Sequence, residues 1–465
     1  SVVGPVAVGG GRLTEVLEQG EVAETGHDNP DYHRGSGACA RKLLCLAQGG
    51  APSCPGGHRE RNDALKGAKD RATPGAMRVH PLVATAAILA LAGCEPPATG
   101  VPLDRPVYPT GLAVHPRGDR LAVVSSSFDS AYEDGALLLA DLDLVRDELA
   151  QNDAEDRRDA IVEGAYVKAA LLPPFGDRPV FTSLGERLLV ATRGNNLVSS
   201  VDVDPDAGFS CGAVEDGTPR CGKSPQALQL PENDPFDVLV LTEVRDDDGL
   251  LTRVDGVVTL LSSSTVYLFR DDRERAGAAQ MQISGTVELG DAVTSVRGTA
   301  LRTRNGQTHV VAAVESFSTT GAGALLVLFL PSADATLSTF DVTTAMGALS
   351  LRDVLVVPGV GAEPDTVIAV TRGPDAIVRF EVDDLPAGPA LRLAGVAESC
   401  AMPTSLALAT LGSVTRVLVT CQASGTIEAL DPRTLMTTDA VRFAGRAPYD
   451  VAVNPVVAEA YVSFF

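Results

Sequence analysis

The sequence predicts an all-β fold, a β-propeller of about seven four-stranded blades over residues 107–465, and three observations predict it. First, alternating and apolar strands separated by Gly, Pro and Asp turns recur along this part of the chain. Second, prolines at positions 109, 179, 235, 403 and 448 lead units of about 45 to 70 residues, the period of propeller blades. Third, the 465 residues are 45% hydrophobic and include 45 Gly and 30 Pro, a globular and turn-rich composition.

The first unit shows the pattern in order. Residues 108–114 alternate as a Pro-led strand, 115–119 supply the Pro, Gly and Asp of a turn, 120–124 form an apolar second strand, and 135–142 form a third. Later units repeat the pattern at 177–202, 235–269, 296–328, 366–380, 402–431 and 447–463. Such units bury little alone and gain stability by packing side by side, so the period favours a propeller over the alternative of one or two β-sandwiches.

Two segments depart from the pattern. Residues 143–164 are rich in Asp, Glu, Arg and Ala, which predicts a helical insertion in the first blade. The final unit reaches only its second strand at Phe464 and Phe465, although ring closure requires every blade to be paired. We expect a truncated last blade, and a closing strand from the stretch near Val107 is the alternative.

The last unit also carries a family resemblance. Pro448-Tyr449-Asp450-Val451-Ala452-Val453-Asn454-Pro455 and Ala460-Tyr461-Val462-Ser463 resemble the YVTN-type repeats of bacterial β-propellers. The resemblance covers nearly all of the chain after residue 106 and implies architecture rather than chemistry. The absence of Trp argues against the tryptophan-aspartate-repeat subclass.

An export signal precedes the repeats. Met77, Arg78 and His80 form a short polar start, and 81–92 is an uncharged apolar stretch of signal-core length, too short to span a bilayer. The closing Leu91-Ala92-Gly93-Cys94 resembles the lipobox of bacterial lipoproteins. The resemblance implies a signal peptide at 77–93, an acylated Cys94 at the mature N-terminus and a tether over 94–106. A buried apolar helix is the alternative.

Residues 1–76 lack sustained periodicity and hold 9 acidic and 9 basic residues. Because the first Met is Met77, we interpret them as a disordered extension translated from upstream of the true start. A metal site is the alternative, but its four candidate ligands lack a CxxC spacing. Those candidates are Cys39, Cys45, Cys54 and His58.

The charge balance excludes nucleic acids as partners, and together with the export signal it suggests a cellular location. The chain carries 60 acidic and 38 basic residues, a net charge of −22, and a nucleic-acid binder needs a basic face instead. Only 9 acidic and 10 basic residues lie in 1–94, so the mature part holds 51 against 28. We expect a monomer anchored by lipid to the bacterial envelope, preferably the outer membrane, and facing the periplasm or the cell surface.

Four cysteines remain once Cys94 is assigned to the lipid. Cys211 and Cys221 flank a short loop, and Cys400 and Cys421 lie near the edges of adjacent strands. An even number in an exported chain predicts two disulfides, and free or metal-binding thiols are the alternative.

Motifs for cofactor chemistry are scarce. The mature part has only His115 and His309, and no CxxCH, GxxxxGK[ST] or HExxH motif occurs. Asp202, Asp204 and Asp206 resemble the front of a calcium loop, although the Gly comes one place late and the closing Glu is missing. We therefore expect no cofactor, with calcium at these aspartates as the possible exception and an acidic turn as the alternative.

The best functional surface follows from the fold. In a propeller, the loops between second and third strands gather at one mouth of the central channel, where they can hold a carboxylate or a peptide. The candidates in these loops are Asp129, Arg193, Asn195, Arg372, Asp375 and Gln422. The first hypothesis is a non-catalytic module that binds a protein, peptide or envelope ligand. The alternatives are a lactonase-like hydrolase and the redox module of a larger haem protein.

Overall fold

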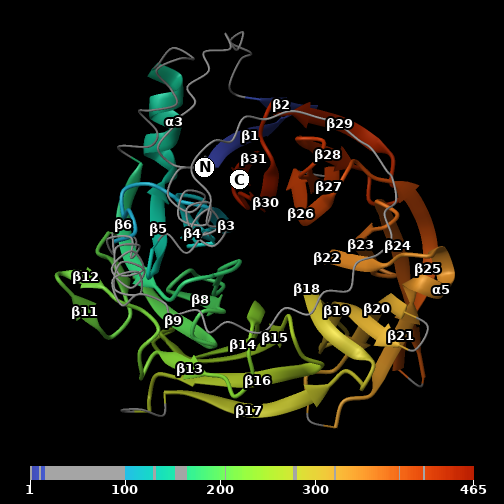
Figure 1. The fold of residues 1–465 in the computed structure, drawn as a ribbon, viewed down its shortest axis with the longest axis horizontal. Helices are drawn as coiled ribbons and strands as arrows, with labels where there is room; N and C mark the ends of the chain where they lie inside the picture. Colours follow the sequence, from blue (N-terminus) through green and yellow to red (C-terminus); the bar gives the residue numbers. More distant parts are fainter. Residues whose placement is uncertain are drawn as a thin grey trace, which may run out of the picture. The chain divides into compact units, whose positions relative to one another are not determined.

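The computed structural model describes residues 3–9, 12–15 and 100–464, apart from 129–131, 152–164, 205, 276–279, 319–320, 333, 387 and 412–413. The signal peptide, Cys94 and Asp129 lie outside these residues. The described part is an all-β propeller, as the sequence predicts, with its antiparallel sheets side by side around a common centre (Figure 1).

Each sheet in the first half of the ring is an antiparallel meander. The first holds β3 (Pro109–Val114), β4 (Arg120–Ser125), β5 (Gly135–Asp141) and β6 (Tyr166–Leu172). The second holds β7 (Val180–Phe181), β8 (Arg187–Thr192), β9 (Leu197–Asp204) and β10 (Gly208–Ser210), and β13 (Ala227–Gln229) also pairs with β9. The third holds β14 (Pro235–Arg245), β15 (Leu251–Leu260), β16 (Thr265–Asp272) and β17 (Met281–Glu288). A separate hairpin joins β11 (Val214–Glu215) to β12 (Thr218–Pro219).

The next three sheets follow the same order. The fourth holds β18 (Val293–Arg304), β19 (Gln307–Ser318), β20 (Gly321–Phe329) and β21 (Leu337–Asp341). The fifth holds β22 (Ser350–Val357), β23 (Thr366–Arg372), β24 (Ala376–Leu385) and β25 (Gly388–Glu398). The sixth holds β26 (Pro403–Leu411), β27 (Val414–Cys421), β28 (Thr426–Leu430) and β29 (Thr437–Arg442). Six blades of the described chain are thus built from consecutive strands.

The predicted last unit is completed by strands from the other end of the chain. It contributes β30 (Pro448–Val453) and β31 (Glu459–Phe464), and β31 pairs with β1 (Val3–Gly9), which pairs with β2 (Arg12–Glu15). Two expectations need correction here. Residues 3–9 and 12–15, assigned to a disordered extension, form strands, and β31 has a partner on its outer side. The stretch near Val107 does not supply that partner.

The innermost strands close the ring. Each contacts the next in the order β3, β7, β14, β18, β22, β26 and β30, and β30 contacts β3 again. Apolar clusters fill the space between successive sheets, including one that joins Leu112 and Leu121 of the first sheet to Ala452 and Tyr461 of the last unit. Because each sheet is covered on both faces, strands such as β8 are buried at every residue instead of alternating.

The helical insertion is confirmed over α3 (Leu142–Gln151), which follows β5 directly. A second helix, α5 (Val342–Met346), begins after Asp341, whose side chain accepts the amide of Thr344 at its N-terminus. Among the described residues, neither helix is long and apolar enough to cross a membrane.

Candidate ligand-binding channel

The residues that line the channel come from β-bulges at the start of the inner strands. The strand register breaks near the first residues of β3, β14, β18, β22, β26 and β30. A bulge leaves a residue out of the ladder and re-aims side chains, so two successive side chains can face the channel. In the second sheet, the equivalent residues Asp177 and Arg178 lie before β7 and are separated from it by Pro179.

These positions form two layers. The mouth layer consists of Thr110, Asp177, Phe236, Arg297, Arg352, Thr404 and Tyr449. The deep layer, one residue further along each strand, consists of Gly111, Arg178, Asp237, Gly298, Asp353, Ser405 and Asp450. A cavity of about 240 Å³ is lined by every member except Gly111. The ends of the second strands and the loops that follow them add Phe128, Arg193, Leu261, Arg372 and Gln422 to the mouth layer.

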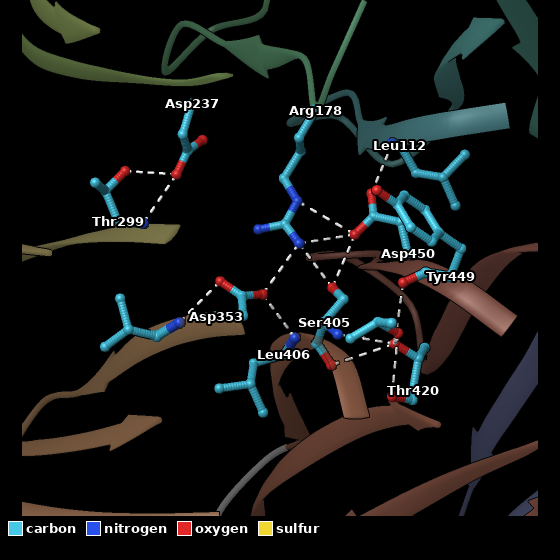
Figure 2. A network of polar contacts seen from close by, with 12 residues as sticks. Leu112, Arg178, Asp237, Thr299, Asp353, Ser405, Leu406, Thr420, Tyr449 and Asp450 are labelled. Carbon is cyan, nitrogen blue, oxygen red and sulfur yellow. Dashed lines mark hydrogen bonds and ion pairs between the residues drawn. The ribbon is translucent and has the colours of Figure 1, made fainter. Parts of the chain in front are cut away.

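Arg178 occupies the centre of the deep layer (Figure 2). Its Nη2 donates to Asp450 Oδ1 at 2.8 Å, to Asp353 Oδ2 at 3.1 Å and to Ser405 Oγ at 2.7 Å. Ser405 Oγ in turn donates to Asp450 Oδ1 at 2.8 Å. One guanidinium therefore joins the second, fifth, sixth and last units and neutralises buried charge in the deep layer.

The deep-layer aspartates also tie each unit to the next. Asp237 Oδ2 accepts the amide of Thr299 at 2.9 Å, and Asp353 Oδ2 accepts that of Leu406 at 2.8 Å. Asp450 Oδ2 accepts the amide of Leu112 at 2.9 Å. Each of these amides belongs to the inner strand of the following unit, so the three carboxylates act as links around the ring.

Small residues stand beside these links. A Cβ on Gly111 would lie 2.5 Å from Arg178 Cα, and one on Gly298 would lie 2.9 Å from Asp353 Cα. Glycine is therefore required where neighbouring inner strands approach most closely.

Burial governs the ionisation of the deep layer. It raises the pKa of Asp237 and of Asp353, although Arg178 works in the opposite direction on both. Burial also opposes the charge of Arg178, but Asp450 and Asp353 outweigh it and raise the pKa of the guanidinium. Arg178 therefore offsets part of the cost of burying the carboxylates of Asp237 and Asp353.

The mouth layer is cationic on one side. Arg297, Arg352 and Arg372 belong to the fourth and fifth sheets and share the cavity. Arg297 Nη2 donates to Glu315 Oε2 at 2.8 Å, and Arg372 Nε donates to the carbonyl oxygen of Pro403 at 3.2 Å. Arg352 makes no hydrogen bond or ion pair with the described residues, and its Nε is buried.

Burial and like charge disfavour these cations. Burial lowers the pKa of Arg352, and Arg372 and Arg297 lower it further. Burial likewise lowers the pKa of Arg372, with Asp375 working in the opposite direction. An anion bound among the three would relieve this repulsion.

Asp177 is the residue that the second unit contributes to the mouth layer. Only 5% of the residue is exposed, and burial raises its pKa to about 7 despite the nearby guanidinium of Arg193. Arg193 Nη2 lies 3.5 Å from Asp177 Oδ2, and that oxygen has no hydrogen bond among the described residues. Arg193 also lies over the ring of Phe128, 5.2 Å from its centroid.

The loop residues predicted from the sequence divide into two groups. Arg193, Arg372 and Gln422 line the cavity. Asn195 is exposed and lies outside its lining, and Asp375 instead accepts the amide of Met402 at 2.9 Å. The sequence analysis missed the bulge residues, although an Asp stands two places after the leading prolines Pro235 and Pro448.

The proposed calcium loop is not assembled. Asp202 is paired with Arg187 and Arg273, and Asp204 accepts the amides of Asp206 and Ala207 within its own turn. Among the described residues, no group of three or more His, Cys, Asp or Glu side chains is placed to hold a metal ion.

Both predicted disulfides are confirmed. Cys211 and Cys221 pair across the β11–β12 hairpin, with their Cα atoms 4.9 Å apart. Cys400 and Cys421 pair with a Cα separation of 5.8 Å, beside the loop that carries Gln422.

Comparisons with known proteins find solved structures that resemble this chain at low sequence identity. No family model and no curated protein matches this chain. The WD40 domain of Toxoplasma gondii coronin is 10% identical, with a TM-score of 0.49, and the match covers 78% of this chain and 82% of that one. The periplasmic gluconolactonase of Pseudomonas aeruginosa is 15% identical over 72% of this chain and 84% of its own, with a TM-score of 0.46. A putative 6-phosphogluconolactonase of Bacteroides uniformis is 15% identical over 71% and 83%, also with a TM-score of 0.46.

Proposed function

We propose that this chain is an envelope lipoprotein, anchored through Cys94, whose propeller binds a ligand at the mouth of its channel. The ligand is a protein, peptide or envelope component that presents an acidic group. In this proposal the YVTN-type ring has seven units, with β30 and β31 as the inner strands of the seventh. The observation that carries the binding role is the group formed by Arg297, Arg352 and Arg372 at the cavity, which share a single carboxylate partner, Glu315, among the described residues.

The charge of the whole chain makes this group informative. The net charge is −22, yet five of the cavity's lining residues are arginines. Arg178 is neutralised by Asp353 and Asp450, and Arg193 faces Asp177. Among the described residues, Glu315 is the only carboxylate that forms an ion pair with Arg297, Arg352 or Arg372, so these arginines supply unused donors to an incoming acidic group.

Fluorescence anisotropy with labelled peptides tests the binding role. Peptides with acidic side chains and amidated counterparts of the same sequence are titrated into the wild-type chain and into Arg297→Ala/Arg372→Ala. We expect only acidic peptides to bind the wild type, with about tenfold or greater loss in the variant. Equal affinities for the two proteins would show that the mouth layer is not the binding surface.

Anchoring has a separate test. Cys94→Ser should move the protein from the membrane fraction to the soluble fraction and remove the acyl mass from its N-terminal peptide. Unchanged fractionation without any acyl mass in the wild type would contradict the lipoprotein assignment.

Hydrolysis of a lactone is the second candidate, and Asp177 favours it. A carboxyl group with a pKa of about 7 in a cavity is ionised to a useful degree near neutrality and can act as a general base toward water. A pH-stat assay with glucono-δ-lactone should then show activity in the wild type and loss of at least about a hundredfold in Asp177→Asn. No acceleration above the uncatalysed rate would reject hydrolysis of this lactone.

A further inference from the structure

We infer that the mouth layer contains a subsite for a hydroxylated organic monocarboxylate, with Arg297, Arg352 and Arg372 on the carboxylate and Asp177 on a donor of the same ligand. This inference rests on the proposed function and names the chemistry of the group that the mouth recognises. It joins two features of the cavity that have no structural explanation of their own.

The first feature is the placement of the three arginines. Arg297 and Arg352 are bulge residues at equivalent positions on neighbouring inner strands, and β18 contacts β22. Arg372 ends β23 and is the register partner of Ser350 in β22. Three guanidinium groups therefore reach one cavity from two adjacent sheets.

The contacts of these three arginines leave guanidinium N–H donors available for a ligand. Glu315 accepts from Arg297, but it also accepts from Ser295 at 3.0 Å and from Ser350 at 2.6 Å. Arg372 is held by a backbone carbonyl instead of a carboxylate. The guanidinium of Arg352 has no hydrogen bond or ion pair with the part of the chain that the structure describes, and a planar carboxylate matches its fork of N–H donors.

The second feature is the unsatisfied carboxyl oxygen of Asp177. A buried polar atom without a hydrogen bond costs free energy. Asp177 lines the cavity, and its Oδ2 is buried without a hydrogen bond among the described residues. Arg193 is its nearest cation, at 3.5 Å. A hydroxyl group on the ligand would supply the missing hydrogen bond.

The surrounding carboxylates select the charge of the ligand. Asp237, Asp353 and Asp450 line the deeper part of the same cavity. They repel a phosphate dianion more strongly than a carboxylate monoanion. The size of the cavity, about 240 Å³, suits a small acid or one terminal group of a larger ligand.

Isothermal titration of the full chain with four probes tests the subsite. Glucuronate carries both groups, cyclohexanecarboxylate has only the carboxylate, glucose has only hydroxyls, and inorganic phosphate is the dianion. We expect glucuronate to bind best, about tenfold or more better than each of the others. Tighter binding of phosphate or glucose than of glucuronate would overturn the inference.

Variants assign the two contacts. Arg352→Ala should weaken glucuronate at least about tenfold, Arg352→Lys should restore only part of the loss, and Asp177→Asn should remove the preference for glucuronate over cyclohexanecarboxylate. Arg433→Ala, at an exposed arginine outside the cavity, should bind like the wild type, and circular dichroism should show that all variants are folded. Equal affinity of folded Arg352→Ala and the wild type would overturn the subsite.

The outcome is separable from that of the proposed function. If acidic peptides bind at the mouth and none of the small acids does, the subsite is wrong and the binding module stands. If glucuronate binds through Arg352 and the peptides do not, the choice of a peptide or protein ligand is wrong and the subsite stands.

Discussion

Asp450 accepts the backbone amide of Leu112 at 2.9 Å across 338 residues of sequence, and its other oxygen accepts Arg178 at 2.8 Å. A single buried carboxylate thus links the last inner strand to the first and fixes the central arginine. Asp237 and Asp353 each accept an amide of the following unit in the same way. The aspartates of the deep layer therefore hold neighbouring units of the ring together.

Replacing Arg178 should show how far the stability of the ring depends on this central cation. Arg178→Met leaves Asp353 and Asp450 buried near each other without compensation. We expect a loss of about 3 kcal/mol at pH 8, the low end for a broken buried pair because a third of the Arg178 side chain is exposed. The variant's two carboxyl groups should have raised pKa values, so the loss should shrink as the pH falls and they bind protons.

Urea unfolding at pH 8 and pH 5 measures this effect. The control is Arg392→Met, which removes a guanidinium from an exposed ion pair and should leave the urea midpoint unchanged at both pH values. A pH-independent loss in Arg178→Met would indicate lost packing instead of uncompensated charge.

The close approach at Gly111 gives a steric prediction. Gly111→Ala places a Cβ against the backbone of Arg178 and should lower the free energy of unfolding by about 1–3 kcal/mol. Gly100→Ala, where no atom lies within 4 Å, is the matched control and should be neutral. Thermal unfolding followed by circular dichroism compares the two, and equal melting temperatures would contradict the close approach of the first and second units.

Asp177 should make stability depend on pH. Its pKa is about 7 in the folded chain against 3.8 for the ordinary group, so the folded state holds a proton that the unfolded state has lost. The contribution is present below about pH 4 and is lost as the pH rises through about 7. Asp177→Asn should therefore gain stability relative to the wild type between pH 4 and pH 8, by at most about 4 kcal/mol. Parallel denaturation curves across this range check it, and a constant difference would show that Asp177 titrates normally.

The two disulfides should differ in what they protect. Cys400→Ser/Cys421→Ser opens a loop beside Gln422 at the cavity, whereas Cys211→Ser/Cys221→Ser opens a peripheral hairpin. Each should cost about 2–4 kcal/mol. We expect only the Cys400 and Cys421 pair to alter glucuronate affinity, as measured by titration of both folded variants. The reverse pattern would place the ligand away from the mouth.

The sequence predicted the architecture well because strand periodicity and turn residues are local signals. The α3 insertion followed from the Asp, Glu, Arg and Ala content of its segment, and the two disulfides followed from the even number of cysteines. The cavity residues Arg193, Arg372 and Gln422 followed from their places after second strands. The mouth and deep layers were missed because a bulge is a change of register between two strands, which no single strand's pattern reveals. The pairing of β31 with β1 was missed because it joins residues more than four hundred positions apart.

We propose above all that the arginines of the mouth layer form the ligand site. A crystal structure of the chain with glucuronate tests it most directly. We predict the carboxylate within hydrogen-bond distance of Arg352 and Arg372, with a hydroxyl at Asp177. Glucuronate bound outside the channel, or turned with its carboxylate away from the arginines, would contradict the account.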